Sequence, residues 1–174
     1  VSSGGMRDLF APSYRLRTLW LWLAFAMNAF ILYLLVSWLP TLLLAAGWSA
    51  SQAQQAVAFN QAGGILGGLL LAWLMDRLGG ERILLVGFLV SAASLLLFLV
   101  APSGFWTWGA LLLVIGACIG GAQFALPSLG TRYYPADILS TGTGWGSAAA
   151  RVGSFVAPLL GGALMPGGMT TQNL

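Results

Sequence analysis

An arginine stands near the middle of the last long apolar stretch of this sequence. Arg151 lies inside the run from about residue 141 to 165. A charged side chain at the centre of a bilayer costs about 2.5–3.5 kcal/mol on insertion scales. The guanidinium is always charged and planar, so in a low-dielectric cavity it can hold a carboxylate through two parallel hydrogen bonds. We predict that Arg151 binds or gates an anionic substrate. The alternative is an internal ion pair with an acidic residue on a helix outside this chain.

Neutral polar side chains lie within the other apolar stretches, where each would be costly if it faced lipid. We expect these side chains to face the helix bundle or a water-filled path, and predict that they bind substrate beside Arg151: Asn28, Tyr33, Asn60, Gln61 and Gln123. For each of them, helix packing is at least as good an interpretation. Asn60 in particular shares a helical face with Ala56, Gly64 and Gly68, a pattern typical of close helix–helix contact.

A short charged loop between two apolar stretches is a candidate for a conformational latch. It contains Asp76, Arg77, Gly79 and Arg82. The arginines can reach the carboxyl ends of neighbouring helices, where a positive charge complements the helix dipole. We predict that this cluster breaks when the helices rock. A solvated turn that only sets the orientation of the chain is the alternative.

The residue types exclude several other chemistries. The sequence has no His and a single cysteine, Cys118, so it carries neither a His-based metal site, nor a Ser-His-Asp triad, nor a disulfide framework. Its glycine pairs lack the Lys-Ser or Lys-Thr partner of a phosphate-binding loop, so an ATP-driven pump is unsupported. We predict that the chain is not an enzyme and needs no cofactor or metal.

The composition points to lipid as the solvent of the elements that carry these residues. Only 6% of residues are charged and 59% are hydrophobic, whereas a soluble domain has about 25% charged residues. The seven arginines are scattered around apolar segments, which suits membrane orientation and not a nucleic-acid surface. We therefore predict an all-α integral membrane protein with five membrane-spanning helices, at about residues 19–46, 53–75, 83–101, 105–129 and 141–165.

The charged residues alternate with these spans. Ten of the eleven charged residues fall before the first span or between spans two and three or four and five, and only Arg151 lies within a span. The positive-inside rule then places residues 1–17 and the other charged loops in the cytoplasm, and residues 166–174 outside as an extracytoplasmic tail. Because the number of spans is odd, the last span ends outside, and we expect a longer protein in which a sixth helix returns to the cytoplasmic side.

The charged loop resembles a motif of the major facilitator superfamily. An Asp-Arg-x-Gly turn, here Asp76-Arg77-Leu78-Gly79, joins spans 2–3 and 8–9 in that family. Ala72 and Gly80 replace the usual glycine and second basic residue, as is typical of the 8–9 copy. The resemblance implies that the chain holds helices 7 to 11 of a twelve-helix carrier, ending before the last helix of a six-helix half-bundle. Residues 1–17 would end the linker from an amino-terminal half outside this chain.

Other segments are similar to the aromatic acid:proton symporters, which include benzoate and 4-hydroxybenzoate permeases. They are residues 134–145, Arg151-Val152-Gly153, Ser37-Trp38-Leu39-Pro40-Thr41 and residues 120–123. Leu139 departs from the pattern, because the family usually has an arginine there. The resemblance implies proton-coupled uptake of an aromatic or related small organic acid by alternating access, in a bacterial inner membrane.

Two alternative functions stay open from the sequence. The first is a related carrier that takes up a sugar acid or exports a hydrophobic compound. The second belongs to another class, a helical membrane scaffold or channel subunit without transport activity. A repeated six-span half upstream would favour a carrier. No carboxylate lies deep in a span here, so a proton-coupled carrier would hold its main titrating acid in the other half.

Overall fold

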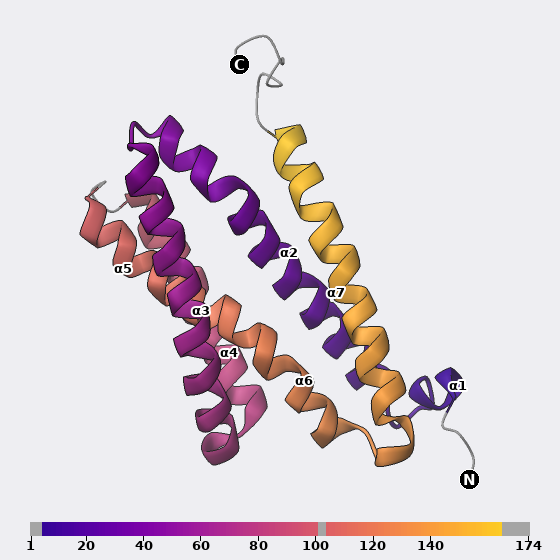
Figure 1. Ribbon diagram of the computed structural model, residues 1–174. Helices are drawn as coiled ribbons and strands as arrows, with labels where there is room; N and C mark the ends of the chain where they lie inside the picture. Colours follow the sequence, from indigo (N-terminus) through magenta and orange to yellow (C-terminus); the bar gives the residue numbers. More distant parts are fainter. Residues whose placement is uncertain (1–4, 101–103, 165–174) are drawn as a thin grey trace.

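The computed structural model describes residues 5–100 and 104–164, and within these ranges the secondary structure is entirely helical. The helices are α1 (Met6–Leu9), α2 (Arg15–Ala45), α3 (Ala50–Leu78), α4 (Gly80–Val100), α5 (Phe105–Ile115), the π-helical turn η1 (Gly116–Gly120), α6 (Gly121–Tyr133) and α7 (Ala136–Leu164). The helices α5, η1 and α6 follow one another without a break. They form a single rod, so the long elements are five rods joined by short connections (Figure 1).

Successive rods run in opposite directions. The α3–α4 and α6–α7 connections lie at one end of the molecule together with α1, and the α2–α3 turn lies at the other end (Figure 1). The charged segments found in the sequence therefore gather at a single end. Their assignment to the cytoplasm, and the division into residues 1–17, 18–165 and 166–174, stay predictions; residues 1–4, 101–103 and 165–174 lie outside the described residues.

Four of the rods are long and apolar enough to cross a membrane: α2, α3, residues 80–98 of α4, and the rod from Phe105 to Tyr133. The prediction of an all-α, multi-pass membrane protein is confirmed. The fifth rod, α7, is as long as α3, with 29 residues, but it is not among these four. Its amino-terminal half is rich in Gly, Ser and Thr and it carries Arg151, which lowers its hydropathy.

The last two rods extend beyond the predicted spans. The fourth predicted span ended at residue 129, whereas α6 continues to Tyr133, and α7 begins at Ala136 instead of 141. Pro135 explains the early start of α7. Its carbonyl accepts hydrogen bonds from the amides of Ile138 and Leu139, and proline is favoured where a helix begins. Hydropathy cannot detect helical turns that project past the hydrocarbon, because those turns are polar.

Close backbone contact joins α3 to the rod of α5, η1 and α6. A Cβ atom at Gly67 would overlap the backbone of Ala117, and one at Gly116 would overlap the carbonyl of Asn60. The rod widens into a π-turn at this crossing, where the Gly121 amide bonds to the Gly116 carbonyl five residues earlier. Small residues on both sides let the two helices approach to backbone contact, and we call this contact the glycine seam.

The helices α2 and α7 lie side by side (Figure 1). A Cβ atom at Gly153 would overlap the Ala26 carbonyl oxygen, so only glycine allows this approach. At their charged end the Trp22 Nε1 donates to the Gly142 carbonyl over 2.9 Å, and the Trp22 ring stacks on Trp145. The segment that resembled the symporter family therefore docks the start of α7 onto α2.

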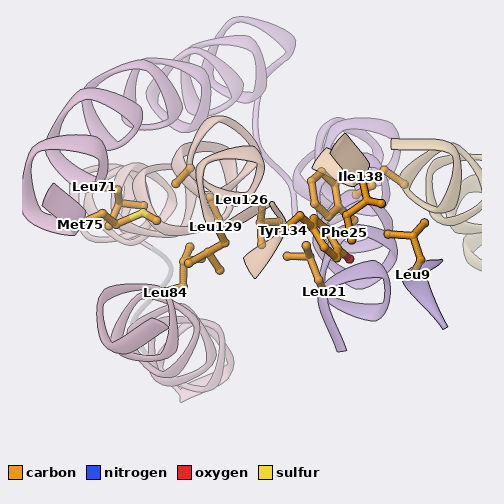
Figure 2. Close-up of a cluster of buried hydrophobic side chains, with 14 residues drawn as sticks. Leu9, Leu21, Phe25, Leu71, Met75, Leu84, Leu126, Leu129, Tyr134 and Ile138 are labelled. Carbon is orange, nitrogen blue, oxygen red and sulfur yellow. The ribbon is translucent and has the colours of Figure 1, made fainter. Parts of the chain in front are cut away.

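A hydrophobic cluster ties these two pairs of rods together. Figure 2 shows Leu126 and Leu129 of α6 between Leu71 and Met75 on one side and Phe25 and Tyr134 on the other. All of these side chains are buried. At this end α6 connects the glycine seam to the α2–α7 pair, and at the other end α2 packs directly on α3 through a second buried cluster.

Candidate functional site

A cavity of about 290 Å³ opens between α2, α6 and α7. Its volume is close to the lower end of the range of about 300–1,000 Å³ that is typical of ligand pockets. Three predicted binding residues, Tyr33, Gln123 and Arg151, line it from three different helices. The other lining residues are Phe25, Ala29, Pro127, Ser147, Ala150 and Ser154.

Arg151 lines the cavity from α7, and its guanidinium has no partner in the described part of the chain. Within the described residues, its guanidinium makes no hydrogen bond and no ion pair. The neighbouring hydroxyls do not bond to it, because Ser147 Oγ donates to the Thr143 carbonyl over 3.0 Å and Ser154 Oγ donates to the Arg151 carbonyl over 2.8 Å. The described part of the chain therefore supplies no internal ion pair for Arg151. The five N–H donors of the guanidinium are available to a ligand or to another part of the protein.

Gln123 is held in the cavity wall by a buried neighbour. Asn28, with 0% of its surface exposed, donates from Nδ2 to Gln123 Oε1 over 3.0 Å. This bond joins α2 to α6 directly behind the cavity. Asn28 itself does not line the cavity, so the structure assigns it a place beneath the site and not in its wall.

The residue types that line the cavity match a small anion with an apolar body. It combines one cation, an amide and a phenol with the rings of Phe25 and Tyr33, and none of its lining residues is acidic. A carboxylate fits the guanidinium in a bidentate manner, and an aromatic ring fits against the ring surfaces. The exposed Tyr33 ring, with 46% of its surface free, is open for such contact.

A second, larger hollow of about 660 Å³ lies between α2, α4 and α6. Its walls are mostly leucine and aromatic side chains, and its two charged residues already have partners. Glu81 accepts a hydrogen bond of 2.6 Å from the Tyr133 hydroxyl, and the Arg17 guanidinium lies 5.9 Å from the centre of the Tyr133 ring. This hollow therefore has fewer free hydrogen-bonding groups for a polar ligand than the smaller cavity has.

Two of the predicted binding residues lie elsewhere. Asn60 is buried in the glycine seam, where its Nδ2 donates to the Leu112 carbonyl over 3.1 Å. Gln61 is exposed on the outside of α3. Neither residue lines the cavity. For Asn60 the observed contact is the helix-packing alternative, and a role of either residue in substrate binding stays a prediction without support from the cavity.

The predicted latch lies at the charged end of the molecule. Gly79 ends α3 with a φ of +96°, a conformation that glycine adopts readily and other residues rarely do. The Arg77 guanidinium lies 4.3 Å from the centre of the Trp73 ring on its own helix. The side chains of Asp76, Arg77 and Arg82 form no hydrogen bond or ion pair to another helix among the described residues. Their role as a latch stays a prediction.

Other residues make the hydrogen bonds that join different helices at the charged end. Arg132 Nη2 donates over 3.0 Å to the Met75 carbonyl in the last turn of α3, and Tyr133 bonds to Glu81. Nearby, the Tyr134 hydroxyl donates to Thr18 Oγ1 over 3.0 Å. Burial raises the pKa of Tyr134, so its hydroxyl stays protonated at neutral pH and keeps donating.

The sequence interpretation missed several cavity residues, two of which had a readable signal. Ser147 and Ser154 are four residues before and three residues after Arg151, so all three lie on one face of α7. Phe25, Ala29 and Pro127 had no such signal. They are apolar residues in apolar helices, and only the packing of α2 against α6 and α7 decides that they face the cavity.

Comparisons with known proteins agree with this architecture. The family model described as the Major Facilitator Superfamily matches residues 5–169. The chain is 35% identical to the gallate transporter of Pseudomonas putida, over 94% of this chain and 36% of that protein. It is 38% identical to the 4-hydroxybenzoate transporter PcaK of Pseudomonas aeruginosa, over 90% of this chain and 35% of that protein. It is 34% identical to the 3-(3-hydroxy-phenyl)propionate transporter of Escherichia coli, over 98% of this chain and 42% of that protein.

The chain thus spans about a third of the length of the first two relatives. No solved structure matches it. The names of the relatives confirm both the predicted resemblance to aromatic-acid permeases and the prediction that the chain is not an enzyme. Its helical membrane fold and the match over nearly its whole length lead to one conclusion: the chain belongs to the Major Facilitator Superfamily.

Proposed function

We propose that this chain is the second half of a secondary carrier for an aromatic or related small organic acid. The observation that carries the proposal is the Arg151 guanidinium, which has no partner among the described residues, in a cavity that is also lined by Gln123, Tyr33 and Phe25. A carboxylate would bind to Arg151 and the aromatic ring would lie against the ring side chains. The names of the matched relatives, which include gallate and 4-hydroxybenzoate transporters, support this class of substrate.

Transport would occur by alternating access and uptake would be coupled to protons. In this mechanism one half rocks against an amino-terminal half that lies outside this chain, and the substrate sits near the middle of the bilayer. The four acidic residues, Asp8, Asp76, Glu81 and Asp137, all lie at or near helix ends at the charged end of the molecule. The titrating carboxylate would therefore belong to the other half. The charged end would face the cytoplasm of a bacterial cell, in its inner membrane.

The test is uptake of a panel of labelled acids by cells that make the whole carrier. The panel contains benzoate, 4-hydroxybenzoate and gluconate, and the variant is Arg151→Ala. Arg15→Ala is a matched control, because it removes the same charge from the start of α2, away from the cavity. We expect uptake of an aromatic acid that Arg151→Ala lowers more than tenfold at equal protein level and Arg15→Ala leaves nearly unchanged.

Two results would contradict the proposal. Normal uptake by Arg151→Ala would remove the role of this arginine, and uptake of gluconate alone would point to a carrier of sugar acids. Proton coupling has its own measurement. Collapsing the protonmotive force with an uncoupler should abolish accumulation against a gradient, and unchanged accumulation would exclude protons as the coupling ion.

A further inference from the structure

The hydrogen bond between Asn28 and Gln123 uses only half of each amide. Asn28 donates from Nδ2 to Gln123 Oε1, so Asn28 Oδ1 and the two N–H groups of Gln123 Nε2 do not take part in it. Asn28 Oδ1 is buried and has no hydrogen-bond partner among the described residues. A buried acceptor without a partner destabilises the fold, because it has lost its hydrogen bonds to water and gained none. An apolar side chain would avoid this cost and would lose the bond to Gln123. Because the unpartnered acceptor offsets the gain from that bond, stability alone does not explain why an asparagine stands here.

The place of Gln123 suggests what the asparagine does. Gln123 lines the cavity beside Arg151, and its Nε2 makes no hydrogen bond within the described residues. When Oε1 is bonded to the buried Asn28, the opposite edge of the same planar amide is its donor edge. Without that bond the amide could rotate and present its oxygen to the cavity, where it would repel a carboxylate.

We propose that Asn28 is a positioning residue, which orients Gln123 so that its Nε2 donates to the carboxylate bound at Arg151. The inference rests on the proposed function, since it assigns a second contact to the same anion. In this arrangement Gln123 presents its N–H groups, and not its oxygen, to the carboxylate. The destabilising, unpartnered Asn28 Oδ1 is then the consequence of holding the donor edge of Gln123 toward the ligand.

The test is a double-mutant cycle on uptake of labelled 4-hydroxybenzoate by the whole carrier. Asn28→Leu removes the orienting donor, and Gln123→Met removes the amide that it orients. We expect Asn28→Leu to raise KM about fivefold and Gln123→Met about tenfold, with kcat changed less than twofold. Because Asn28 acts through Gln123, the double variant should show about the same KM as Gln123→Met alone, and not the product of the two effects.

A second measurement separates positioning from a structural role. Asn28→Leu removes a buried unpartnered acceptor, so the purified variant should unfold thermally at the same temperature as the unsubstituted protein or at a higher one. Asn28→Ser, whose hydroxyl is too short to reach Gln123, should raise KM similarly and serves if the leucine variant is not produced. Ser91→Ala is the matched control, because it removes another buried polar atom that has no partner among the described residues, on α4 and outside the cavity, and it should leave KM unchanged.

The outcomes distinguish this inference from the proposed function. If no labelled aromatic acid is taken up, or if Arg151→Ala has no effect, the proposed function fails. If the unsubstituted carrier works, Arg151→Ala is defective, and Asn28→Leu has a normal KM, only the positioning role is overturned. Effects of Asn28→Leu and Gln123→Met that multiply in the double variant would also overturn it, because the two residues would then act independently.

Discussion

Asn28 and Asn60 are buried amides on neighbouring helices, and they differ in what their hydrogen bonds accomplish. Asn60 donates to a backbone carbonyl across the glycine seam, where small residues let the two backbones touch. Asn28 donates to another side chain, Gln123, beside a cavity lined by Arg151, whose guanidinium has no partner in the described part of the chain. Of the two amides, only that of Asn28 leaves a buried atom unpartnered.

The difference separates a scaffold from a site within one half-bundle. In the glycine seam most close contacts join one backbone to another, which favours a fixed crossing of α3 with the rod of α5, η1 and α6. On the cavity side the polar groups belong to side chains, and several of their donors are unused. The Arg151 side chain is exposed and its donors make no hydrogen bond within the described residues, so they are available to an anionic ligand.

The largest effect is expected from filling the glycine seam. In Gly67→Val the new side chain would overlap the backbone of Ala117, which can move only if the helices separate. Overpacking of this kind costs about 3 kcal/mol or more, and we expect little folded protein when extracts are examined by fluorescence-detected size-exclusion chromatography. Gly87→Val is the control, since no atom lies within 4 Å of its Cβ position. A normal yield of Gly67→Val would show that the seam is not rigid.

The next effect concerns the cavity and leaves the fold intact. Arg151→Lys keeps the charge but loses the planar pair of donors that fits a carboxylate. We expect KM for the transported acid to rise about tenfold, and the unfolding temperature to stay the same because the guanidinium has no partner in the described structure. An unchanged KM would mean that the charge alone matters, and that bidentate geometry does not.

A smaller effect should distinguish the two asparagines directly. Asn60→Leu removes an interhelical hydrogen bond, which is worth about 0.6–2 kcal/mol in membrane proteins. It should lower the unfolding temperature measured by a thiol-reactive dye on Cys118, while Asn28→Leu should not. If both variants are destabilised equally and neither changes KM, the contrast between scaffold and site is wrong.

The smallest effect is expected at the charged end, away from both amides. Tyr134→Phe removes the hydrogen bond to Thr18 that fastens the α6–α7 connection to α2. The loss should be about 0.5–1.5 kcal/mol of stability with no change in KM. Tyr14→Phe serves as its control, because the Tyr14 hydroxyl makes no hydrogen bond within the described residues. A raised KM for Tyr134→Phe would extend the site to this connection.

The sequence predicted which polar side chains avoid lipid, but it did not predict which of them share the cavity. Arg151, Gln123 and Tyr33 could be selected from the sequence, because a polar side chain inside an apolar helix is costly in lipid and therefore faces the bundle or a cavity. The same argument selected Asn60 and Gln61, which lie outside the cavity. Periodicity along one helix cannot say which neighbour that helix face meets, so packing and ligand binding had the same signature.

The sequence by itself determined the solvent, the class of fold and the alternation of charged and uncharged connections. These depend on hydropathy and charge summed along the chain, and no knowledge of the packing is needed. Only the tertiary structure decided that Phe25, Gln123 and Arg151 share a cavity, and that Asn28 stands behind it. That arrangement depends on the rotation and crossing of each rod, which contacts such as that between Gly153 and Ala26 set to within a few ångströms. Asn28 and Gln123, 95 positions apart in the sequence, are brought together only by the packing of α2 against α6.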